Sequence, residues 1–123
     1  MFEELCDEND LEWTEHRLRV HVMSLKKSGD VEALFRLYGV LGHVLARRGD
    51  FLKAQDALND AEYLLVEHKW RGTVMEAWCH LDRGRVFQAF GRENLAQTNF
   101  DRARELAAEF GNEELDLALA AIQ

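Results

Sequence analysis

Proline is absent from the 123-residue sequence, and isoleucine occurs only once, at Ile122. Leu and Ala are abundant instead, and because both favour helices over sheets, an all-β fold is excluded. Hydrophobic residues make up 47% of the chain and charged residues 31%, which is typical of globular proteins and not of disordered ones. The length suits a single domain over residues 1–123 that can bury a core of its own.

Basic residues are in the minority, because 15 Lys and Arg stand against 23 Asp and Glu, a net charge of −8. A general binder of nucleic acid needs the opposite sign, so we expect no nucleic-acid partner. The acids are densest in the first 15 residues, which we interpret as a solvated lead-in that faces no bases. These acids are Glu3, Glu4, Asp7, Glu8, Asp10, Glu12 and Glu15.

Cysteine is scarce as well. Cys6 and Cys79 have neither the spacing of metal ligands nor the number that a disulfide framework requires, so a reducing, cytoplasmic location is expected. The N-terminus has no basic region followed by an apolar one, and no apolar run approaches the ~20 residues of a membrane span. We therefore predict neither an export signal nor a membrane partner.

Five glycines lie at regular intervals between segments of helical composition, and each predicts a turn. Asp30 and Asp50 each follow one of these glycines, and we expect their carboxylates to cap the next helix by accepting backbone N–H groups. The five glycines are Gly29, Gly49, Gly72, Gly91 and Gly111.

The segments between the turns carry apolar residues at i, i+3, i+4 and i+7, which predicts about six helices. Their expected ranges are 8–27, 31–48, 51–69, 73–90, 93–110 and 113–122. Because the connections are too short for crossovers, neighbouring helices should pack antiparallel. The expected fold is all-α, with an N-terminal helix (8–27), two helical hairpins (31–69 and 73–110) and a C-terminal capping helix (113–122).

An internal repeat with a spacing of 42 residues relates the two hairpins, with small residues matching small ones and large matching large. The first copy consists of Gly42, Leu45, Gly49, Ala54, Leu58 and Ala61. The second copy consists of Gly84, Phe87, Gly91, Ala96, Phe100 and Ala103.

This pattern resembles the tetratricopeptide repeat (TPR), in which a small residue precedes an aromatic or Leu in the first helix and Ala, a large residue and Ala follow in the second. The resemblance covers residues 35–112, and eight residues beyond the usual 34-residue unit place it with a longer variant of the repeat. Two positions of the second copy depart from the pattern, because Arg83 replaces the expected Leu and Glu93 the expected aromatic. Close helix crossings are implied where Gly42 meets Ala54 and where Gly84 meets Ala96.

The resemblance also implies a short right-handed α-solenoid whose concave wall is built from the first helix of each pair. Transferred to this sequence, the exposed positions of that wall are Arg36, Gly39, His43 and Arg47 in the first copy and Trp78, Leu81, Arg85 and Gln88 in the second. Arg36, His43 and Arg47 would lie within about 20° of one line along their helix.

The predicted wall gathers bases and one aromatic residue, with Asp82 as the only nearby acid. Such a wall suits an acidic or carboxylate-bearing peptide, since Arg binds carboxylates bidentately and Trp supplies an anchor. We therefore expect a protein-protein interaction scaffold that binds its partner through Arg36, His43, Arg47, Trp78, Arg85 and Gln88. Its binding should tighten as an exposed His43 becomes protonated near pH ~6.5.

Two other interpretations remain open at this point. The wall could be a solvated face that covers a buried Trp78. Alternatively, the chain could be a structural module that forms a homo-oligomer through the ends of the helical stack, since short arrays leave apolar end faces uncovered. The apolar stripe of the first predicted helix (Leu11, Leu18, Val22 and Leu25, beside Trp13 and Met23) would then cap either its own chain or a partner.

Catalytic patterns are weak in this sequence. No histidine has a carboxylate three residues before it, which removes the usual motif of a di-metal site in a helical bundle. His80 follows Cys79 but points about 100° away around a helix, so a structural thiol is favoured over a nucleophile. Glu76 and His80 have the spacing of a surface pair. We predict no enzyme, with no catalytic residue, metal or cofactor.

Overall fold

The computed structural model describes residues 5–122, and within that range the chain forms helices and no strand. The prediction of an all-α fold is therefore confirmed. No helix in the described part of the chain is long and apolar enough to cross a membrane. The helices are α1 (Leu11–Ser28), α2 (Val31–Arg47), α3 (Phe51–Glu67), α4 (Val74–Ala89), α5 (Glu93–Ala107) and α6 (Glu113–Ala120).

Side-chain caps mark the starts of α1, α2, α3, α4 and α6, whereas Arg92 before α5 makes none. The Asp30 carboxylate accepts the N–H of Ala33, and the Asp50 carboxylate accepts the N–H of Lys53, so both predicted caps are confirmed. The prediction of a helix from residue 8 is wrong, because Asp10 caps α1 and the helix begins only at Leu11. Residues 5–10 form a separate segment before α1, while Glu3 and Glu4 lie outside the described residues.

All five predicted turn glycines have positive φ angles, between 60° and 81°. This left-handed conformation costs glycine little, because it has no Cβ. The helices α1, α2, α4 and α5 therefore end within four residues of the glycine that the sequence marks, and the following helix can return antiparallel to each. After α3, which ends at Glu67, the first left-handed residue is Lys69 (φ 58°), before the predicted turn at Gly72.

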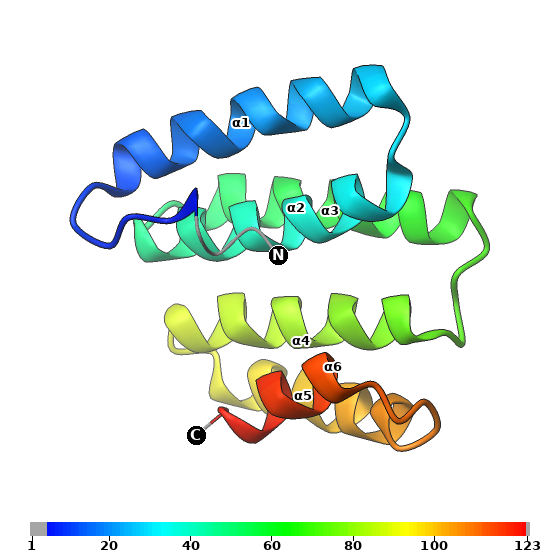
Figure 1. The fold of residues 1–123 in the computed structure, drawn as a ribbon. Helices are drawn as coiled ribbons and strands as arrows, with labels where there is room; N and C mark the ends of the chain where they lie inside the picture. Colours follow the sequence, from blue (N-terminus) through cyan, green and yellow to red (C-terminus); the bar gives the residue numbers. More distant parts are fainter. Residues whose placement is uncertain (1–4, 123) are drawn as a thin grey trace.

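The helices are stacked in layers (Figure 1). The most extensive contacts join α4 to α5 and α2 to α3, and α4 also packs against both α2 and α3. At one end of the stack α1 covers α2 of its own chain through buried Leu18 and Val22, while Trp13 and Met23 remain exposed. At the other end, α6 packs against α5.

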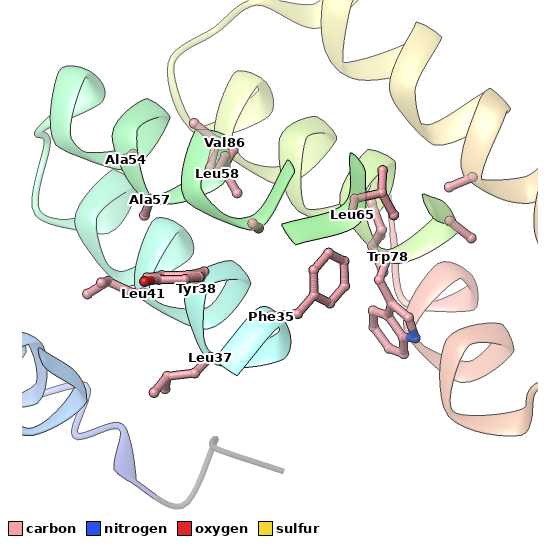
Figure 2. Packing of buried hydrophobic residues seen from close by; sticks show 14 of the residues in the cluster. Phe35, Leu37, Tyr38, Leu41, Ala54, Ala57, Leu58, Leu65, Trp78 and Val86 are labelled. Atoms are coloured by element: carbon pink, nitrogen blue, oxygen red, sulfur yellow. The ribbon is translucent and has the colours of Figure 1, made fainter. Parts of the chain in front are cut away.

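A glycine allows close approach of the helices at the centre of each hairpin. A methyl group on Gly42 would lie 3.0 Å from Cδ2 of Leu58 and 3.5 Å from the carbonyl oxygen of Ala54. The neighbour of Gly84 differs from the expected Ala96, because the closest atoms there all belong to Phe100. The ring of Phe100 lies closer to the methyl position at Gly84 than Leu58 lies to that at Gly42 (Figure 2 shows Leu58 and Ala54 within the core).

The two departures of the second copy have structural reasons. Arg83 reaches α3, where its guanidinium donates to Asn59 at 3.0 Å and to Glu62 at 2.8 Å. Glu93 is exposed, whereas its counterpart Phe51 packs edge-on against Phe90 with ring centroids 4.8 Å apart. An aromatic residue thus stands at this position in the first copy, where the next hairpin packs against it, and is replaced by Glu93 in the second.

Candidate functional site

A cavity of about 380 Å³ opens between α2 and α4 and is bordered by residues 5–10 and by α6. We call it the α2–α4 groove. Its lining residues are Cys6, Glu8, Leu11, Arg36, Gly39, Val40, His43, Val44, Arg47, Trp78, Asp82, Arg85, Glu114 and Ala118.

Most of the predicted concave residues meet in this groove. Arg36, His43, Arg47, Trp78 and Arg85 all line it, together with Gly39. Gln88 is half-buried and does not line the groove. Gly39 and Trp78 line the groove but are buried, so their predicted exposure is wrong. Leu81 belongs to the core and is fully buried, so its predicted exposure is wrong too. The reason is that α4 turns this position toward the packed interior of the two hairpins.

Arg36 and Trp78 form one end of the groove. The carbon at the centre of the Arg36 guanidinium lies 3.5 Å from the centroid of the Trp78 ring, an arrangement that favours a cation–π interaction. The same guanidinium lies 3.2 Å from a carboxylate oxygen of Glu114 on α6. Trp78 is only 5% exposed (it is labelled in Figure 2), so its ring supports Arg36 and is not an open anchor.

Arg47 and Arg85 form the other end. Arg47 makes an ion pair with Glu8 from the segment before α1, and Arg85 lies 3.8 Å from a carboxylate oxygen of Asp82. Every arginine of the groove therefore has a carboxylate partner. The expectation that Asp82 is the only nearby acid is wrong, because Glu8 and Glu114 also reach the groove.

The interpretation of the acidic N-terminal stretch as a lead-in that faces no bases is also wrong. Glu8 pairs with Arg47, and Glu15 lies 2.8 Å from Arg19 and 2.5 Å from Arg48. Glu15 and Arg19 are one turn apart on α1. The pairs with Arg47 and Arg48 form because the chain folds back before α1 and α1 then packs on α2, so acids that are early in sequence come to lie beside α2 and the turn after it.

His43 is half-buried near the middle of the groove. Burial lowers its pKa below the ordinary value of 6.5, and the charges of Arg85 and Arg47 lower it further, while Glu8 opposes this shift. The titration expected near pH 6.5 for an exposed imidazole therefore moves to lower pH. His43 contributes a neutral, polar surface to the groove at pH 7.

Gly39 brings Asp82 into the floor of the groove. A methyl group at position 39 would overlap the Asp82 carboxylate, so the carboxylate can lie this close only while position 39 is glycine. Asp82 in turn lies beside Arg85 on the same helix. The pair places one negative and one positive group next to each other on the α4 wall.

The residues considered for catalysis lie outside the groove. Burial, assisted by the negative charge of Asp82, raises the pKa of the Cys79 thiol to about 12, so this thiol stays neutral and is a poor nucleophile. His80 hydrogen-bonds to both Asn99 and Glu76. Between residues 5 and 122, no three His, Cys, Asp or Glu side chains are grouped as metal ligands.

Sequence patterns did not identify Glu8 and Glu114 as groove residues. Glu8 lies 39 positions from Arg47, and Glu114 lies 78 positions from Arg36. One local signal was available for Glu8. Asp10 is a residue type that caps helices, so it indicates that the residues before it form a separate segment.

No protein-family model, curated protein or solved structure matches this chain.

Proposed function

We propose that this chain is a non-enzymatic protein-interaction module that binds an acidic peptide segment in the α2–α4 groove. The observation that carries this proposal is the position of three arginines, Arg36, Arg47 and Arg85, around one cavity in a chain of net charge −8. Arginine is the side chain best suited to binding carboxylates, because its planar guanidinium can donate two parallel hydrogen bonds.

The finer architecture that we propose is a short right-handed TPR-like solenoid of two hairpins. Two features support it. The first helix of each hairpin, α2 and α4, contributes to the same groove. The close approaches at Gly42 and Gly84, against Leu58 and Phe100, lie at equivalent positions 42 residues apart.

The two ends of the groove would play different parts in binding. Arg36 is held between Trp78 and Glu114, and its side chain is mostly buried, so it provides a fixed positive wall. Arg47 and Arg85 have more exposed side chains, and a ligand can reach them from solvent. A carboxylate of the partner would bind there first.

A binding experiment with a defined acidic probe tests the proposal. Fluorescein-labelled hexaglutamate should bind with an affinity that falls as salt rises, whereas hexalysine should not bind. The double variant Arg47→Gln/Arg85→Gln should lose this binding. The matched control is Arg104→Gln on α5, which removes an exposed arginine outside the groove and should bind like the parent. Equal binding by the groove variant and the control would rule the groove out as the site.

Self-association through the ends of the stack is the second candidate. It is favoured by exposed apolar side chains on the outermost helices, such as Met23 on α1 (62% exposed) and Leu117 on α6 (65%). Light scattering on the parent and on Met23→Glu and Leu117→Glu variants would test it. A dimer mass that falls to the monomer mass in either variant would favour this candidate, and a monomeric parent would remove it.

A further inference from the structure

Residues 5–10, which we call the strap, cross the Arg47 end of the groove before α1 begins. Hydrogen bonds to a single buried side chain hold it. The N–H of Asp7 donates to Oγ1 of Thr14 at 2.8 Å, and that hydroxyl lies 3.0 Å from the carbonyl oxygen of Asp10. Leu5 and Cys6 pack partly against the core. The strap is thus a defined structure and not a solvated tail.

Glu8 lies at the outer edge of the strap and directs its carboxylate to Arg47. Both side chains remain accessible, Glu8 at 58% and Arg47 at 41%. An ion pair this exposed is weak and is screened by salt. The contact therefore gives Arg47 a carboxylate partner and leaves this partner easily exchanged for another carboxylate.

We propose that Glu8 is an internal ligand of the groove, and that an acidic partner binds by replacing the Glu8 carboxylate on Arg47 with one of its own. This inference rests on the proposed function, because it concerns how access to the same groove is regulated. It also defines the partner more closely, as a segment whose carboxylate can occupy the place that Glu8 holds beside Arg47 and His43.

An internal ligand lowers the apparent affinity of the groove by the fraction of molecules in which it is displaced. Removing the Glu8 charge should therefore strengthen binding of an acidic probe. For an exposed pair, the expected gain is about two- to fivefold. A purely structural contact would instead leave the affinity unchanged when its charge is removed.

Fluorescence anisotropy with labelled hexaglutamate tests this in the full chain. The Glu8→Gln variant should bind about two- to fivefold more tightly than the parent. The control is Glu12→Gln, an exposed residue of α1 that does not line the groove, because it removes the same charge from the chain. If both variants gain equally, net charge explains the effect and the internal ligand is disproved.

Hydrogen exchange at the Asp7 amide gives a second readout, which needs no ligand. This amide is bonded to Thr14 in the closed strap, so it should exchange faster in Glu8→Gln than in Glu12→Gln, and faster in the parent when hexaglutamate is added. Salt-sensitive hexaglutamate binding that Glu8→Gln leaves unchanged would overturn the internal ligand and keep the groove. If hexaglutamate binds neither the parent nor any variant, while the Asp7 amide still exchanges faster in Glu8→Gln, the proposed function of the groove is disproved.

Discussion

The hairpins α2–α3 and α4–α5 are built on the same crossing and the same turn, but they differ where the second helix begins. Asp50 caps α3, whereas Arg92 stands at the equivalent position before α5 and makes no side-chain cap. Phe51 packs against Phe87 of α4 and against Phe90 just after it, whereas Glu93 is exposed. The comparison shows that the residues packed inside the two hairpins are alike. The residues on the outside of each hairpin differ, because they contact different neighbours.

The interior of the two hairpins should be equally intolerant of added volume. Ala54 and Ala96 are equivalent and almost fully buried. Replacing either with Leu should lower the free energy of unfolding by roughly 1–3 kcal/mol, because the core has no room for three more carbons. Chemical denaturation measures this loss. A large loss at one position with none at the other would break the equivalence of the hairpins.

The two crossings should differ in how they tolerate one methyl group. In Gly84→Ala the new methyl would lie within 2.5 Å of Cδ1 of Phe100, and a ring in a packed core moves with difficulty. We expect a net loss of about 1–2 kcal/mol, after the helical preference of Ala is included. In Gly42→Ala the neighbour is the end of the Leu58 side chain, and the loss should be close to zero. Thermal unfolding of the two variants compares them, and a greater loss in Gly42→Ala would contradict this explanation.

At the α1 end of the stack, the mostly buried carboxylate of Glu15 joins α1 to Arg48. Burial alone would raise its pKa, but hydrogen bonds from Arg19 and Arg48 outweigh burial and lower it below the ordinary 4.5. A lowered pKa means that the stabilisation is present above pH 4.5 and is lost as the pH falls through the folded-state pKa.

The Glu15→Gln variant should therefore be less stable than the parent by about 1 kcal/mol at pH 7. The difference should shrink as the pH is lowered below 4.5 and through the folded-state pKa, because the parent carboxylate then becomes protonated as well. Urea unfolding at pH 7 and over a series of lower pH values measures it, and a difference that stays constant with pH would show that the charge of Glu15 is not responsible.

The smallest expected effect concerns the caps. Asp50→Ala should cost about 0.5–1 kcal/mol, since it removes the acceptor for the N–H of Lys53. Arg92→Asp should stabilise the chain by a similar amount, because it introduces at α5 the cap that α3 already has. Both are measured by thermal unfolding, with Arg92→Ala as the control for loss of the arginine. A loss of stability in Arg92→Asp would mean that the two helix starts are not equivalent.

Much of the fold could be predicted because its signals are local. Helical spacing, the turn glycines and the caps at Asp30 and Asp50 act within a few residues of each other, and the structure has them where the sequence places them. The start of the first helix was missed because the apolar pattern alone does not distinguish a helix from the segment before its cap.

Some residues of the groove could be predicted from the sequence, and the burial of others could not. Helical periodicity places Arg36, His43 and Arg47 along one line, but the expectation that this line faces a shared wall came from the resemblance to the tetratricopeptide repeat. Trp78 and Arg85 joined them once the two hairpins were aligned by their 42-residue repeat. The burial of Trp78 could not be predicted from the repeat, because it depends on the positions of the Arg36 side chain and of the neighbouring helices.

The sequence by itself determined the all-helical class, the turns and the arginines of α2, because each follows from spacing along one chain segment. Only the tertiary structure decided the charge balance of the groove. Glu8 and Glu114 come from opposite ends of the chain, and their partners Arg47 and Arg36 lie 39 and 78 positions away. Neither helical periodicity nor the 42-residue repeat relates Glu8 to Arg47 or Glu114 to Arg36, so these ion pairs exist only after the helices have packed and brought the two ends to one cavity.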